Sequence, residues 1–135
     1  MNSYFYHAQI NVDLSKNKQF YKDLMEFLGW TTIFEESEMI GFKSKTNGDL
    51  WFIEPDDKTQ QDYDRIGMNH LSIRVDELKN IDEITEMLKK KGTETLFGTP
   101  KHRPEFTGDE SKTYYQIMFE SPDKILFEIV YIGPK

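Results

Sequence analysis

Two of the three histidines in this chain occupy matching positions in two similar segments. His7 begins HAQINVD and His70 begins HLSIRVD, so both segments read H-x-x-I-x-V-D. Isoleucine and valine at such spacing are typical of a half-buried strand, and the aspartate suits the start of a helix. Neither element requires a histidine. We therefore interpret His7 and His70 as paired functional groups, with a surface or structural role as the alternative.

A third residue, Glu128, could complete a metal site with these histidines. The chain has no cysteine, so any further ligand must be an oxygen atom. Glu128 lies in ILFEIVY, where hydrophobic residues flank it on both sides, and a carboxylate there must be paired, protonated or bound to a cation. A salt bridge across the sheet is the alternative. The pattern predicts one divalent ion (Zn, Ni, Co, Mn or Fe(II)) bound by His7, His70 and Glu128.

Two further residues could contribute acid–base chemistry. Glu54 follows WFI at a strand end and could supply a fourth ligand or a base, unless it is simply solvated. His102 in the loop sequence KHRPE could donate a proton from a lid, and the adjacent Arg103 could contact an anion. A charged surface loop is the alternative for both. Aligning LWFI (50–53) with LFEI (126–129) sets Phe52 opposite Glu128, so the first half lacks a matching carboxylate.

The overall charge narrows the class of partner. The net charge is −7 and no stripe of lysine or arginine offsets it, which disfavours binding to a phosphate backbone. The first residues show no export signal, and no apolar stretch is long enough to cross a membrane. We expect a cytoplasmic protein that binds a small molecule, with no nucleic-acid or membrane partner.

The first half of the chain reads as one strand, one helix and three strands. Alternation over residues 4–12 predicts a strand with Ile10 and Val12 on one face and His7 and Gln9 on the other. A helix follows and ends at Gly29. Its expected buried stripe is Phe20, Tyr21, Leu24, Phe27 and Leu28. The remaining strands are expected at residues 30–34, 39–43 and 50–54.

The second half repeats this order. Residues 69–75 alternate, with His70, Ser72 and Arg74 on the polar face. A helix is expected at 78–91, and its stripe is Leu78, Ile81, Ile84 and Leu88. Strands are expected at residues 94–97, 113–120 and 125–131, with a long polar loop at 98–112. The chain is therefore expected to form one domain of two modules, 1–54 and 67–135, joined by a linker at 55–66.

The polar face of each first strand should look into the space that the sheets enclose, because the aliphatic face must contact the helix. That face carries the histidines. We expect the substrate to contact other polar or flexible side chains there, together with the loop arginine. These candidates are Gln9, Ser72, Arg74, Arg103, Gln116 and Met118.

Three segments together resemble the vicinal oxygen chelate superfamily, which includes glyoxalase I, the extradiol dioxygenases, fosfomycin-resistance transferases and bleomycin-resistance binding proteins. The segments are HAQINVDLSKNKQFYKDLMEFLGW, NHLSIRVDELKNIDEI and YYQIMFESPDKILFEIVY. The resemblance implies an α+β fold, in which two repeated βαβββ modules form an open, curled mixed sheet around a central cavity with helices outside. It also places His7, His70 and Glu128 at the ligand positions, and Glu54 near the variable fourth. The turn SPDK replaces the family's usual DPDG.

The resemblance implies a chemistry as well. Two histidines and one carboxylate leave open positions on a metal ion, where neighbouring substrate oxygens can bind. We expect a metal-dependent, glyoxalase-like lyase or isomerase. One alternative is an Fe(II) extradiol-type dioxygenase, for which His102 and the pair Tyr114 and Tyr115 are the visible acid–base candidates. Another is a metal-free small-molecule binding or resistance protein. Related chains often pair, so a homodimer is possible.

Overall fold

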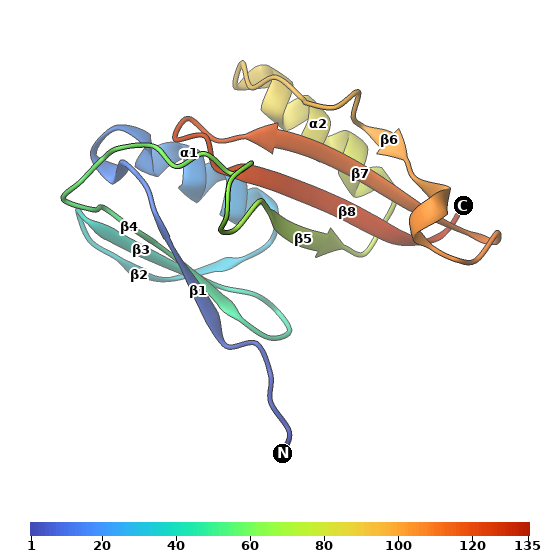
Figure 1. Cartoon of the computed structure of the whole chain (residues 1–135), viewed down its shortest axis with the longest axis horizontal. Coiled ribbons are helices and arrows are strands. Elements are labelled where there is room, and N and C mark those ends of the chain that lie inside the picture. The colour runs from blue at the N-terminus through green and yellow to red at the C-terminus, as the bar shows by residue number, and fades with distance from the viewer. The chain divides into compact units, whose positions relative to one another are not determined.

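The computed structural model describes all 135 residues, which form two compact units. Unit 1 spans Met1–Gln60 and unit 2 spans Gln61–Lys135. Each contains one open, four-stranded mixed sheet and one long helix, in the order β-α-β-β-β (Figure 1). The predicted α+β class and the repeated βαβββ module are confirmed, whereas the single-domain organisation stays a prediction. Neither helix is long and apolar enough to cross a membrane.

Unit 1 has the strand order β1-β4-β3-β2, with β1 parallel to β4 and the other neighbours antiparallel. Its elements are β1 (His7–Asn11), α1 (Leu14–Phe27), β2 (Thr31–Glu35), β3 (Met39–Lys43) and β4 (Asp49–Ile53). The first strand is shorter than predicted, because its pairing with β4 begins at His7, opposite Asp49, the first residue of β4. Its alternation is as predicted: Ile10 is buried and His7 is exposed.

Helix α1 covers one face of this sheet. Tyr21, Leu24 and Met25 are fully buried, and the Tyr21 ring stacks on the Phe52 ring at 4.6 Å between centroids. The predicted stripe was wrong at Phe27, which is 50% exposed. Six residues separate Phe27 from Tyr21, which places it about 120° around the helix and away from the sheet. Met25, four residues after Tyr21, packs there instead.

The other face of the same sheet carries Trp51 over a glycine. Gly41 of β3 pairs in register with Trp51 of β4. A Cβ atom on Gly41 would lie 2.6 Å from the Trp51 ring, so only glycine leaves room for the indole. The centroids of the Phe34 and Trp51 rings are 5.9 Å apart. Trp51 therefore forms an aromatic surface on the face of β4 that lies opposite helix α1.

Glu54 fastens the end of β4 to the beginning of α1. Its Oε1 accepts hydrogen bonds from the Ser15 backbone N–H at 3.1 Å and from the Ser15 hydroxyl. The Lys58 ammonium lies 2.9 Å from the same oxygen. The Ser15 hydroxyl and then Lys58 hold the pKa of Glu54 down at about 2. The carboxylate also satisfies an N–H in the first turn of the helix, where negative charge is favourable.

Unit 2 has the strand order β5-β8-β7-β6, with β5 parallel to β8 and the other neighbours antiparallel. Its elements are β5 (Leu71–Val75), α2 (Lys79–Lys90), β6 (Lys101–His102), the 3₁₀ turn η1 (Pro104–Phe106), β7 (Lys112–Glu120) and β8 (Leu126–Pro134). Helix α2 lies across β7 and β8 (Figure 1). Its buried residues Ile81, Ile84 and Leu88 match three positions of the predicted stripe, whereas Leu78 is half-buried and lies just before the helix.

The face of this sheet that packs on α2 is built from odd-numbered residues of β7 and β8. Phe119 and Phe127 are fully buried, and their rings stack at 5.5 Å. The hydroxyl of Tyr115 donates to Asp82 of α2 at 2.8 Å, which identifies the helix side. The even-numbered residues of β7 and β8 therefore lie on the opposite face.

The predicted strand at 94–97 was wrong. Only Thr95 forms a bridge, to Phe119, because Phe97 and Gly98 both adopt positive φ and turn the chain away from β7. The fourth strand of the sheet is instead β6, inside the segment predicted to be a loop. It pairs Lys101 with Gln116 and His102 with Tyr115.

A substitution at Gly41 tests the aromatic surface of unit 1. We expect Gly41→Ala to lower the free energy of unfolding by about 1–3 kcal/mol, because the new methyl group overlaps the Trp51 ring. Both tryptophans, Trp30 and Trp51, lie in unit 1, so urea unfolding followed by tryptophan fluorescence reports on this unit. In a Trp51→Leu background the same change should cost less than about 0.5 kcal/mol. An equal cost in both backgrounds would contradict the packing argument.

The contact between Glu54 and Ser15 predicts a pH dependence. The pKa of Glu54 is lower in the folded chain than its ordinary value of 4.5, so its contribution is present above about pH 4.5 and lost as the pH falls towards about 2. Wild type should therefore unfold at higher urea than Glu54→Gln at neutral pH, and the gap should close in acid. Glu38→Gln, at an exposed glutamate of the same unit, is the matched control and should show no such closing gap.

Candidate functional site

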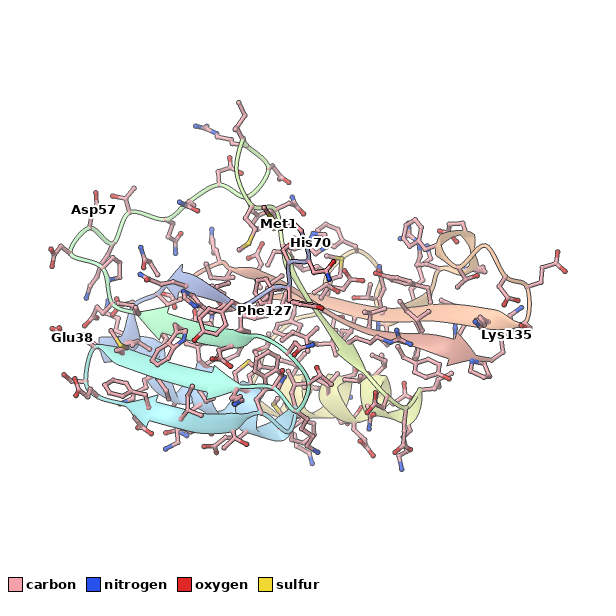
Figure 2. All side chains as sticks on the ribbon, turned by 90° about the horizontal axis from the view of Figure 1, so that it is seen from below. Met1, Glu38, Asp57, His70, Phe127 and Lys135 are labelled. Atoms are coloured by element: carbon pink, nitrogen blue, oxygen red, sulfur yellow. The ribbon has the colours of Figure 1, made fainter.

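His70 and Glu128 meet on one face of the unit 2 sheet. Strands β5 and β8 are parallel neighbours, and Ser72 pairs in register with Glu128. His70 stands two residues before Ser72, so its side chain lies on the same face (Figure 2 labels it at the beginning of β5). The His70 Nε2 and the Glu128 Oε2 are 3.1 Å apart. The sequence prediction that these two residues share a site is consistent with this contact.

The Glu128 carboxylate is buried, with 3% of the residue exposed. No lysine or arginine pairs with it. Its two oxygens have separate partners: Oε2 faces His70, and Oε1 accepts a hydrogen bond from the Tyr114 hydroxyl. The burial of the Tyr114 phenol, together with the Glu128 carboxylate, raises the pKa of Tyr114 well above its usual range. The phenol therefore keeps its proton and acts as a donor to Glu128.

Asn69 determines which nitrogen of His70 carries a proton. The Asn69 side-chain amide donates to the Tyr63 carbonyl oxygen at 2.9 Å, so its own oxygen faces His70. That oxygen lies 2.8 Å from the His70 Nδ1 and can only accept a hydrogen bond. The proton is consequently on Nδ1, and in the neutral ring Nε2 presents a lone pair towards Glu128.

Two acceptor atoms, an imidazole nitrogen and a carboxylate oxygen, therefore face each other at 3.1 Å. A proton or a cation must lie between them to make this contact favourable. The donor set also suits a divalent ion. Two ligand atoms that each lie about 2.1 Å from one ion, with an angle of about 90° at the ion, would be about 3.0 Å apart. The side chain of His70 is 37% exposed, so the pair is accessible from solvent on that side.

His7 lies in unit 1, at the beginning of β1, and is exposed. Its ring rests against the Tyr6 ring at 5.0 Å between centroids. No group of three or more histidine, aspartate or glutamate side chains converges in the structure. The role of His7 as a third ligand stays a prediction, and so does any ligand role of Glu54.

The predicted substrate-binding residues of unit 2 mostly share the face of Glu128. Met118 pairs in register with Glu128, and Gln116 is the next even-numbered residue of β7. Ser72 lies beside Glu128 on β5, and Arg74 donates to the Ile132 carbonyl oxygen at 2.8 Å. Gln9 lies in unit 1, where its amide donates to Asn11 at 3.0 Å. Substrate contacts of these residues stay predictions.

His102 lies on the opposite face of the unit 2 sheet. Its ring stacks on Tyr115 at 4.2 Å between centroids, and its Nδ1 lies 2.7 Å from the Thr113 hydroxyl oxygen. Tyr115 in turn donates to Asp82 of helix α2. The register thus separates His102 from Glu128 by the thickness of the sheet. The acid–base role that the sequence suggested for His102 stays a prediction, but its ring does not share the face of Glu128.

Arg103, the next residue, packs against the site from outside. Its guanidinium lies 4.7 Å from the centre of the Phe106 ring and donates to Glu105 at 2.6 Å. The edge of Phe106 meets the Tyr114 ring at 5.3 Å. The Arg103 backbone N–H also donates to the Tyr114 carbonyl oxygen at 2.7 Å. This part of the predicted loop therefore holds Tyr114 in place.

The strand registers correct the internal alignment of the two halves. Gln9 pairs with Trp51 in unit 1, and Ser72 pairs with Glu128 in unit 2. The counterpart of Glu128 is therefore Trp51, one residue before the predicted Phe52. The alignment of LWFI with LFEI by residue type is therefore wrong by one position. Sequence reasoning also missed Asn69, for which the only available signal was its place directly before His70.

Comparison with known proteins agrees with this architecture. The model of the Glyoxalase/Bleomycin resistance protein/Dioxygenase superfamily matches residues 5–129. Uncharacterized protein YqjT of Bacillus subtilis (strain 168) is 26% identical over 132 residues, which cover 93% of this chain and 96% of that protein. A candidate glyoxalase from Bacillus halodurans is 28% identical, with a TM-score of 0.77 over 94% of each chain.

A more distant structure has the same fold. Lactoylglutathione lyase from Agrobacterium tumefaciens is 14% identical, with a TM-score of 0.63 over 96% of this chain and 94% of that chain. Two βαβββ units and a family match over almost the whole length lead to one conclusion: this chain belongs to the Glyoxalase/Bleomycin resistance protein/Dioxygenase superfamily.

Proposed function

We propose that this protein is a metal-dependent, glyoxalase-like lyase or isomerase that acts on a small molecule with neighbouring oxygen atoms. One observation carries the proposal. The His70 Nε2 and the Glu128 Oε2 face each other at 3.1 Å, the histidine accessible to solvent and the glutamate buried, and in the neutral ring with its proton on Nδ1 both atoms are acceptors. His70 and Glu128 would hold the divalent ion, and His7 is the proposed third ligand.

A divalent ion bound there would act as a Lewis acid on substrate oxygens. The residues of the chain itself would hold the ion and orient the side chains that bind it. Tyr114 fixes one carboxylate oxygen of Glu128, and Asn69 fixes the ring of His70. The buried Gln116 and the neighbouring Met118 flank Glu128 on the same face. These side chains are the proposed contacts for the substrate next to the ion, together with Ser72, Arg74 and Arg103.

Glu54 is poorly suited to the role of general base that the sequence suggested. Its Oε1 accepts from Ser15 and Lys58, and its pKa of about 2 lies far below neutral pH. A general base works best when its pKa lies near the working pH. The proton acceptor for a lyase reaction would therefore be a group near Glu128 or an atom of the substrate itself.

The donor set gives one alternative a specific basis. Two histidines and one carboxylate are the ligands of many Fe(II) oxygenases. With His7 as the proposed third ligand, an Fe(II) extradiol-type dioxygenase is therefore the second candidate. A metal-free binding or resistance protein is the third candidate, in which a proton between His70 and Glu128, rather than an ion, would make their contact favourable. A homodimer and a cytoplasmic location stay predictions from the sequence.

Metal binding tests the proposal directly. Apo-protein titrated by calorimetry with Zn, Ni, Co, Mn or Fe(II) should bind one equivalent per chain of at least one of these ions. Glu128→Gln and His70→Ala should each weaken binding by more than about 100-fold, because each removes a direct ligand. His102→Ala is the matched control and should bind like wild type, since its ring lies on the other face of the sheet.

The result also separates the candidate functions. Absence of stoichiometric binding with every ion would rule out both enzyme proposals and favour the metal-free alternative. Conversion of a hemithioacetal by the loaded protein would support the lyase. Oxygen uptake with catechols, with Fe(II) alone, would favour the dioxygenase. A His7→Ala variant that binds the ion as tightly as wild type would remove His7 from the ligand set.

A further inference from the structure

We propose that Asn69 and Tyr114 are positioning residues that hold His70 and Glu128 ready for a divalent ion. The inference rests on the proposed function and goes beyond it, because it assigns the affinity for the ion to two residues that are not ligands. Three hydrogen bonds and one close contact carry it, and every member lies in unit 2. The hydrogen bonds join Tyr63 to Asn69, Asn69 to His70 and Tyr114 to Glu128, and the contact of 3.1 Å between His70 and Glu128 links the two parts.

Asn69 acts on the histidine through its oxygen. Its amide nitrogen donates to the Tyr63 carbonyl oxygen, so the side-chain oxygen of Asn69 cannot turn away from His70 without breaking that bond. A histidine that binds a metal through one nitrogen usually donates the other N–H to an oxygen, which fixes the ring and raises its basicity. Asn69 supplies that oxygen, and the Nε2 lone pair is thereby aimed at the site.

Tyr63 anchors Asn69 to the sheet of unit 2. Its hydroxyl donates to the Glu120 carboxylate at 2.5 Å, and Glu120 is the last residue of β7. The bond to Glu120 raises the pKa of Tyr63 to about 12, so the phenol keeps the proton it donates. The segment that carries Asn69 is consequently tied to the same sheet that carries Glu128.

Tyr114 acts on the carboxylate. Its hydroxyl occupies Oε1, which leaves Oε2 facing His70. A buried carboxylate with one oxygen already bound has less freedom to rotate, so less entropy is lost when an ion binds. Phe106 meets the Tyr114 ring, and the Arg103 guanidinium covers Phe106. Arg103 and Phe106 of the loop thus have a structural role, which is to pack against Tyr114.

The chain offers a matched control for Tyr114. Tyr115 also donates its hydroxyl to a carboxylate, that of Asp82, but on the helix side of the same strand. Tyr114→Phe should weaken metal binding by about 10–100-fold, the range for partners of metal ligands, whereas Tyr115→Phe should leave it unchanged. Calorimetric affinities of both variants, compared with the thermal unfolding of each apo-protein, separate positioning from a general loss of stability.

Asn69 is tested by a conservative pair. Asn69→Ala removes the acceptor and should weaken binding by about 10–100-fold. Asn69→Asp loses the amide donor to the Tyr63 carbonyl oxygen but keeps an acceptor next to Nδ1, so it should lose less affinity than Asn69→Ala. Equal loss in both variants would overturn the role of Asn69, and wild-type affinity in Tyr114→Phe would overturn that of Tyr114. If wild type itself binds no ion, the proposed function fails, and this inference fails with it.

Discussion

A carboxylate buried in the middle of a sheet is the constraint on which the candidate site depends. Glu128 lies on β8, which has β5 on one side and β7 on the other. A charge in that position is costly unless neighbours supply hydrogen bonds or a counter-charge. Both flanking strands contribute: β7 provides the Tyr114 hydroxyl, and His70 stands at the beginning of β5. The strand order of the unit therefore explains which residues can reach the carboxylate.

The first unit has the same strand order and fills the equivalent position differently. Trp51 stands where unit 2 has Glu128, and Gly41 stands where unit 2 has Met118. The glycine makes space for the indole, so this face of unit 1 is aromatic rather than acidic. Of the histidine and the carboxylate that meet in unit 2, unit 1 has only the histidine, His7. The duplication has thus preserved a histidine at the strand start while the chemistry of the last strand diverged.

The alternation of residues in the strands was sufficient to predict much of this arrangement. It placed His70 on the polar face of its strand, and it identified the helices, because periods of two and 3.6 depend only on local sequence. Glu128 was found in another way, as a charge within a hydrophobic strand. The position of β6 was not predictable in this way. Phe97 and Gly98 adopt positive φ, and a strand prediction based on residue type does not register such a turn.

The relative alignment of the two halves also depended on more than residue type. Matching letters set Phe52 against Glu128, but the ladder of hydrogen bonds sets Trp51 there. A shift of one residue exchanges the two faces of a strand, so the error changed a buried core residue into the counterpart of a functional one. Register arises from pairing between strands, and a single sequence carries little information about it.

Tyr114 and Tyr115 are neighbours in the sequence but lie on opposite faces of the sheet, and this decides which carboxylate each contacts. Both are tyrosines on one strand, and each donates a hydrogen bond to a carboxylate. Only Tyr114 lies on the face where a histidine nitrogen also points at the carboxylate, whereas Tyr115 and His102 stack together on the helix side. A phenol–carboxylate pair alone is a structural contact. The metal binding that we propose depends on the third group, His70, whose Nδ1 faces the oxygen of Asn69.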